Sequence, residues 1–362
     1  MLSVIIPTYN ECANLPKLTA ALIRVLNHTR FEILFVDDSI DDTFQIIQDL
    51  AKHDPRIRWM HRHHQRGLAT AVVLGFAKAK GDIVCVMDGD LQHPPELLPE
   101  MLAQINSGAD LVVPSRFLKN GNTRGLTGPR KIIAMGARAL TWFLLPKSRW
   151  ISDPLSGFFM VRRTRLQEIT FNPTGWKILL EVLVKGHFSE IVEVPYCFEP
   201  RCFEASKMSG REQLNFLRHL LRLIVENPVE NWFWRLTIAE LCGLSLLLPL
   251  FTSVTGSLAA PAYLAVLAGG ILLIFPAFTV AIPPVKTQVL FRRLLAIRLS
   301  GIAVLGSGML EQSQWTDNDV GLVILTVGLA VLWNHLLLEY WVRRLYYLET
   351  LDKVAKPELA TN

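Results

Sequence analysis

Two carboxylates flank one glycine in Asp88-Gly89-Asp90, directly after the apolar stretch Ile83 to Met87. The pattern predicts that both carboxylates lie at the end of a buried strand. Carboxylates this close repel each other unless a cation lies between them. Oxygen ligands with a neighbouring amide, here Gln92, suit Mg²⁺ or Mn²⁺, which usually also bind substrate phosphates. Alone, an Asp-x-Asp pair more often forms a polar turn, so the interpretation depends on the residues that accompany it.

Short apolar runs alternate with amphipathic stretches from Leu2 to about Lys207, which predicts an α/β fold with a mostly parallel central sheet. We expect strands over 3–7, 32–36, 57–61 and 82–87, and helices over 14–29, 43–52 and 68–78. Ligands of such sheets bind beyond the carboxyl ends of the strands. Asp37-Asp38 and the Asp88-Gly89-Asp90 run both follow strands, so a ligand site is expected there.

Apolar residues are concentrated after Leu236 in this chain of 362 residues, of which 51% are hydrophobic. Four stretches are candidates to cross a bilayer, 236–254, 262–285, 294–310 and 320–338. The positive-inside rule then places both termini and the α/β domain in the cytoplasm, at the plasma membrane if the source is prokaryotic. The expected domains are a catalytic domain over 1–210, an interfacial amphipathic helix and linker over 211–235, an α-helical transmembrane bundle over 236–345 and a cytoplasmic tail over 346–362.

Two predicted helices, 130–145 and 213–225, combine basic and aromatic residues. Both patterns fit helices of a protein core. The predicted membrane region that follows somewhat favours helices that lie at a membrane interface. The net charge is +5, and the basic residues cluster near apolar segments. This distribution indicates a membrane surface rather than nucleic acid as partner. Five scattered cysteines predict reduced thiols, and the N-terminus reads as a first strand rather than a signal peptide.

Further motifs accompany the acidic pair. In chain order they are Pro7-Thr8-Tyr9-Asn10-Glu11, Asp37-Asp38, Ser115-Arg116, Arg130-Lys131, Asp153-Pro154-Leu155-Ser156-Gly157-Phe158-Phe159, Gly175-Trp176-Lys177, Val194-Pro195, Arg201 and Ser206-Lys207. Together they resemble the GT-A glycosyltransferases of family 2, over Met1 to about Leu223. More narrowly, they resemble the dolichol-phosphate mannose synthase branch, which also includes bacterial polyprenyl-phosphate glucosyltransferases. Each motif alone is unspecific, whereas the full set in this order is specific.

The resemblance implies roles for individual residues. The metal ion, Mg²⁺ or Mn²⁺, is held by Asp88, Asp90 and Gln92, since carboxylates bind a diphosphate only through a cation. A nucleotide-sugar donor is bound by Pro7, Tyr9, Glu11, Val36, Asp38, Asp88, Gly89, Lys177, Arg201 and Lys207. For Glu11, the beginning of a helix offers an alternative role as a carboxylate stabilised by the helix dipole.

The acceptor that the resemblance implies is a polyprenyl phosphate, whose oxygen is already an anion at neutral pH. Its attack on the anomeric carbon needs no general base and inverts that carbon. Arg116, Arg130 and Lys131 are the expected phosphate anchors, because arginine matches phosphate geometry. Asp153 is expected beside the sugar or the acceptor, so the predicted catalytic residues are Asp90, Arg116, Arg130 and Asp153. The partners are then donor, acceptor and bilayer, with a homo-oligomer as an open alternative.

The preferred reaction is mannose transfer from GDP-mannose to a polyprenyl or dolichyl phosphate. UDP-glucose is an alternative donor, and a membrane scaffold or a lipid-carrier translocation partner with a degenerate catalytic domain is an alternative class. A processive polysaccharide synthase is disfavoured, because no Gln-x-x-Arg-Trp motif is present. Glu204 stands where the branch usually has glycine, and Ala134 where it often has serine. These two departures concern the acceptor and lid regions.

Overall fold

The computed structural model describes residues 1–63, 66–123, 128–198 and 210–227. They belong to one compact unit, Met1–Asn227. The predicted membrane stretches, the tail and the segment with Arg201, Glu204 and Lys207 lie outside the described residues. Among the described helices none combines the length and apolar character needed to cross a bilayer.

The described strands form one mostly parallel sheet in the order β3-β2-β1-β4-β6-β5-β7. Their bounds are β1 Leu2–Thr8, β2 Phe31–Asp37, β3 Ile57–His61, β4 Ile83–Val86, β5 Leu111–Ser115, β6 Phe159–Arg162 and β7 Ile191–Pro195. β1 pairs in parallel with β2 and β4, β2 with β3, and β5 with β7. β6 alone among these runs antiparallel, against β4 and β5. The expected α/β fold with a mostly parallel sheet is confirmed.

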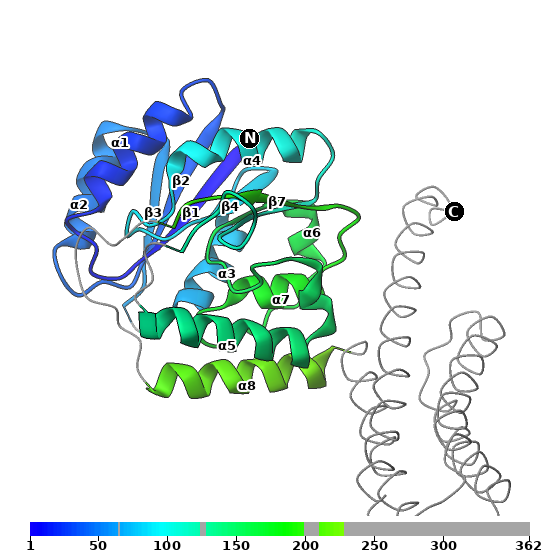
Figure 1. Ribbon diagram of the computed structural model, residues 1–362. Coiled ribbons are helices and arrows are strands. Elements are labelled where there is room, and N and C mark those ends of the chain that lie inside the picture. Colours follow the sequence, from blue (N-terminus) through cyan, green and yellow to red (C-terminus); the bar gives the residue numbers. More distant parts are fainter. Residues whose placement is uncertain (64–65, 124–127, 199–209, 228–362) are drawn as a thin grey trace, which may run out of the picture. The chain divides into compact units, whose positions relative to one another are not determined.

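Helices cover both faces of the sheet (Figure 1). One face packs against α1 Leu15–Val25, α2 Thr43–His53 and α4 Leu98–Asn106, the last preceded by the 3-10 turn Pro95–Leu97. The other face packs against α3 Leu68–Lys78 and α7 Ile178–Lys185, and the short α6 Arg163–Gln167 follows β6. Strands buried on both faces are mainly apolar, as β2 shows: all seven of its residues are buried, and five of them are apolar.

A third layer lies outside α7. It comprises α5 Gly128–Leu144, the 3-10 turn Pro146–Trp150 and α8 Gly210–Glu226. Leu145, Leu180 and Leu220 belong to the small apolar cluster that joins these elements. Figure 1 shows α5 and α8 side by side. The sequence pattern located both helices to within three residues at each end, and α8 packs into the compact unit that ends at Asn227.

Candidate active site

The motif residues meet at one edge of the sheet. β1, β2, β4, β5 and β7 run in the same direction, so their carboxyl ends lie at this edge, and antiparallel β6 begins there. The chain order reverses between β1 and β4, which is where ligands bind in open sheets of this class. The segments that gather there are 9–11, 37–39, 88–93, 115–117, 152–158 and 196–198.

The acidic loop after β4 presents one open and one buried carboxylate. The Asp88 side chain is 34% exposed, whereas Asp90 is buried. Asp90 Oδ1 accepts a hydrogen bond of 3.1 Å from the backbone N–H of Gln92, and Leu91 between them has a φ of 63°. This tight turn brings the Asp90 carboxylate and the Gln92 main chain together.

Two glycines lie next to the Asp88 and Asp90 loop. A Cβ atom on Gly157 would lie 3.2 Å from Asp88 Oδ2, so a larger residue there would require this carboxylate to shift by a few tenths of an ångström. A Cβ atom on Gly89 would lie 3.7 Å from Cγ of Glu11, which places Glu11 next to the acidic loop. The Asp153–Phe159 motif and the Tyr9–Glu11 motif therefore both lie next to the predicted metal loop.

The described residues contain no group of three or more His, Cys, Asp or Glu side chains arranged to hold a metal ion. The predicted set of two carboxylates and one amide falls below that count. The residues nonetheless fit a cation that completes its shell with phosphate oxygens and water, because Asp88 is open to solvent and Gly157 leaves its carboxylate free of steric overlap.

His93 supports the main chain of the acidic loop by a hydrogen bond and by ring stacking, a role that the sequence motif did not reveal. Its Nδ1 accepts the backbone N–H of Asp88 at 3.1 Å, and its ring stacks on Phe158 with centroids 5.0 Å apart. Burial lowers the pKa of His93 to about 4, so the imidazole is neutral at pH 7 and carries its proton on Nε2. Tyr196 and Phe198, just before the segment with Arg201, complete this aromatic cluster.

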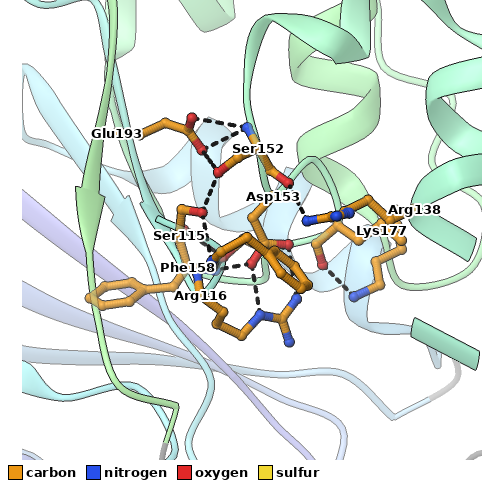
Figure 2. Close-up of polar contacts among 11 residues, drawn as sticks. Ser115, Arg116, Arg138, Ser152, Asp153, Phe158, Lys177 and Glu193 are labelled. Carbon is orange, nitrogen blue, oxygen red and sulfur yellow. Dashed lines mark hydrogen bonds and ion pairs between the residues drawn. The ribbon is translucent and has the colours of Figure 1, made fainter. Parts of the chain in front are cut away.

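Arg116 and Asp153 form a bidentate ion pair in which the Asp153 carboxylate is buried and the Arg116 side chain is 11% exposed (Figure 2). Arg116 Nε donates to Asp153 Oδ2 at 2.7 Å and Nη2 donates to Asp153 Oδ1 at 2.9 Å. The guanidinium also lies 5.2 Å from the ring centroid of Phe198. Asp153 thus engages one edge of the guanidinium, while Nη1 is not part of this pair. Two residues predicted as catalytic are therefore in direct contact, and Asp153 orients the Arg116 guanidinium.

Lys177 reaches the same site from the amino-terminal end of α7. Its Nζ donates to the carbonyl of Leu155 and lies 3.6 Å from the ring centroid of Trp176. Burial, together with the positive charge of Arg116, lowers the pKa of Lys177 to about 7. Lys177, predicted to bind the nucleotide-sugar donor, is therefore close to half protonated at neutral pH.

The predicted donor pocket lies on the β1 and β2 side of this edge. Asp38 is buried and accepts hydrogen bonds from Arg62, at 2.6 Å to Nε, and from the backbone N–H of Gly67 at 3.1 Å. The Arg62 side chain is only 6% exposed, and its charge is paired with Asp38.

The remaining donor residues differ in exposure. Pro7, Tyr9 and Glu11 are half-buried, and the Arg66 guanidinium lies over the Tyr9 ring, 5.5 Å from its centroid. Glu11 accepts a hydrogen bond from the Asn14 amide just before α1, consistent with its alternative role at a helix beginning. Val36 is fully buried in the core of β2, so its predicted role concerns its main chain. The Arg130 side chain, Arg201 and Lys207 lie outside the described residues.

The sequence matches a known family. The profile described as "Glycosyl transferase family 2" covers residues 3–180. A dolichol-phosphate mannosyltransferase of Pyrococcus furiosus is 42% identical over 223 residues, which is 61% of this chain and 63% of that protein, just under two thirds. The Saccharomyces cerevisiae dolichol-phosphate mannosyltransferase is 34% identical over 62% of this chain and 86% of that protein. A polyprenol monophosphomannose synthase of Mycolicibacterium smegmatis is 36% identical over 57% of this chain and 80% of that protein.

Among solved structures, a glucosyl-3-phosphoglycerate synthase from Mycobacterium tuberculosis aligns with 63% of this chain and 79% of that chain, at 20% identity and a TM-score of 0.49. The chain belongs to glycosyl transferase family 2 and, within it, to the dolichol-phosphate mannose synthase branch. The resemblance inferred from the motifs is confirmed.

Proposed function

We propose that this chain transfers mannose from GDP-mannose to a polyprenyl phosphate, with inversion at the anomeric carbon. The names of the similar proteins, dolichol-phosphate mannosyltransferase and polyprenol monophosphomannose synthase, support the sugar and the acceptor. The observation that carries the proposal is the juxtaposition of the acidic loop after β4 with the Arg116–Asp153 pair. Opposite charges sit at one sheet edge, where Arg116 interacts electrostatically with both Asp153 and Asp88.

In the proposed reaction, Asp88, Asp90 and Gln92 would hold Mg²⁺ or Mn²⁺, which would supply positive charge to the leaving diphosphate. Lys177 adds a further cation for the donor phosphates. Arg116 orients the acceptor phosphate, because the guanidinium edge outside its pair with Asp153 still carries N–H donors. The acceptor oxygen is already ionised, so no side chain needs to remove a proton. Electrostatic stabilisation and alignment of the two substrates then account for catalysis.

Formation of the lipid product tests the proposal. Membranes with the full-length protein, radiolabelled GDP-mannose, Mn²⁺ and a polyprenyl phosphate are expected to yield a labelled polyprenyl-phosphate mannose. A parallel assay with UDP-glucose tests the alternative donor. If only UDP-glucose gives a labelled lipid, the transferred sugar is glucose and not mannose. No lipid product from either donor would contradict a transferase.

The state of Lys177 makes donor binding sensitive to pH. Its pKa of about 7 means that the free protein carries mostly charged Lys177 at pH 6 and mostly neutral Lys177 at pH 8. Because a diphosphate requires the charged form, binding at pH 8 must take up a proton. We expect the affinity for GDP-mannose, measured by calorimetry, to fall by about fivefold from pH 7 to pH 8, in line with the charged fraction of Lys177. Lys177→Arg keeps its charge over this range, so an equally steep fall in this variant would contradict the assignment.

We further propose that the chain is a multi-pass membrane protein, with about four helices over 236–345 and the α/β unit in the cytoplasm. The exposed side of α5 and α8 supports contact with a bilayer. Exposed apolar side chains on these helices are Ile132, Ile133, Met135, Leu140, Phe143, Leu214, Leu217, Leu221 and Val225. Adjacent apolar helix surfaces of this kind are typical of interfacial binding.

Charge placed on this surface is expected to interfere with a long-chain acceptor only. Ile132 and Val225 are 73% and 70% exposed, so the double variant Ile132→Asp/Val225→Asp should fold normally. We expect its turnover of long-chain polyprenyl phosphate in liposomes to fall by about tenfold, since buried apolar area drives interfacial binding. Turnover of a short-chain acceptor in detergent should not change. The control Ala20→Asp/Gln45→Asp places the same charges on exposed positions of α1 and α2; equal losses in both variants would contradict membrane contact.

A further inference from the structure

Ser152 is held by the carboxylate of Glu193, a residue of β7 that no motif includes. The Ser152 backbone N–H lies 2.8 Å from Oε1 and 2.9 Å from Oε2 of Glu193, and Ser152 Oγ donates to Oε1 at 2.8 Å. Figure 2 shows this carboxylate of β7 facing Ser152. One glutamate thus fixes both the main chain and the side chain of the residue directly before Asp153.

Ser152 in turn contacts the loop that carries Arg116. Since Ser152 Oγ gives its proton to Glu193, it accepts from Ser115 Oγ, which lies 2.5 Å away. Ser115 Oγ also accepts the backbone N–H of Phe117 at 3.2 Å. The residues on both sides of Arg116 are therefore connected to Ser152, and the Arg116 guanidinium is connected to Asp153.

The carbonyl of Ser152 is also held. Arg138 Nη1 donates to it at 3.3 Å, and the Arg138 guanidinium lies 3.9 Å from the ring centroid of Phe117. Ser152 is consequently bound through its N–H, its hydroxyl and its carbonyl (Figure 2). A residue bound at three points leaves Asp153 little freedom, so the ion pair with Arg116 has one orientation. Glu193 accounts for two of these three points.

We propose that Glu193 is a positioning residue of the acceptor-phosphate site: through Ser152 it fixes Asp153, and through Asp153 it sets the direction of the Arg116 guanidinium. The inference rests on the proposed role of Arg116. Glutamate suits this position because a carboxylate only accepts hydrogen bonds, and the donors of Ser152 face it. Glutamine offers one oxygen instead of two and brings an NH₂ group toward an N–H donor.

Substrate-specific kinetics test the proposal. In Glu193→Ala, the KM for polyprenyl phosphate should rise by about 10- to 100-fold, as expected when a binding group shifts by about 1 Å. The KM for GDP-mannose should stay within about twofold, and Glu193→Gln should lie between wild type and the alanine variant. The matched control is Glu190→Ala, an exposed glutamate just before β7. Equal changes in both KM values, or none, would overturn the inference.

A double-mutant cycle separates positioning from general loss of structure. If Glu193 acts through Asp153, Glu193→Ala adds little to the KM change already caused by Asp153→Asn, whereas additive effects would overturn the inference.

Calorimetry in detergent measures direct binding of a short-chain polyprenyl phosphate and does not depend on sugar transfer. We would compare full-length wild type with Glu193→Ala and Glu190→Ala. Wild type that binds the lipid phosphate but forms no mannosyl lipid would contradict the proposed function alone. Equal binding by wild type and Glu193→Ala would contradict the inference alone.

Discussion

Replacing Asp90 with alanine is expected to lower kcat by about 10³-fold and to abolish metal-dependent binding of GDP-mannose. Asp90 is buried at the carboxyl end of β4 and its carboxylate closes the turn to Gln92. Its loss removes a predicted metal ligand. It also removes the hydrogen bond that shapes the loop with the other two predicted ligands, Asp88 and Gln92. Loss of one preorganised electrostatic group commonly costs about 10²–10³ in kcat. Radiolabelled transfer measures turnover, and calorimetry with Mn²⁺ measures binding.

The control for this variant is Asp82→Ala. The Asp82 side chain is 82% exposed just before β4 and pairs with the N-terminal amine at the surface. It should retain wild-type turnover and wild-type metal-dependent binding. Asp90→Ala with turnover equal to Asp82→Ala would remove Asp90 from the metal site.

Replacing Arg116 with alanine is expected to reduce both stability and transfer. Asp153 is 1% exposed, so removing its partner leaves an uncompensated buried carboxylate. Breaking such a pair typically costs about 3–5 kcal/mol of unfolding free energy. Transfer should fall by about 10²–10³-fold, because the acceptor phosphate loses its cation. Denaturant unfolding and the radiolabelled assay measure the two effects separately.

The double variant Arg116→Ala/Asp153→Asn distinguishes the two roles of Arg116. Neutralising Asp153 removes the buried charge, so stability should recover in part while transfer should not. Arg24→Ala provides the surface control, since Arg24 and Glu96 form an exposed pair whose loss is expected to cost under about 1 kcal/mol. Recovery of transfer in the double variant would show that Arg116 has only a structural role.

The sequence predicted β1 to β4, α2, α3, α5 and α8 well, because each is encoded locally, whereas α1 ends four residues earlier than expected. No prediction was made for β5, β6, β7, α4, α6 or α7. β3 and α3 match their predicted bounds, and α2 and β4 differ by a residue at one or both ends. The gathering of acidic motifs at one edge followed from the rule for parallel strands. The bend of the Asp153 motif against Asp88 did not, because it depends on β6 running antiparallel to β4.

Side-chain partners were the least predictable part of the site. Arg62 with Asp38, His93 with Phe158, and Glu193 with Ser152 join residues that are 24, 65 and 41 positions apart. No local spacing encodes such pairs, since they follow from strand order. The sequence carried no signal for Glu193, because a charged residue between Val192 and Val194 is the usual alternation of a half-buried strand.

Calorimetric titration of GDP-mannose into the full-length protein, with Mn²⁺ and again after chelation, tests the central claim most directly. The account predicts saturable binding with the metal ion and none after its removal, with Asp82→Ala behaving as wild type. Undiminished binding after chelation would contradict a metal ion held by the acidic loop after β4.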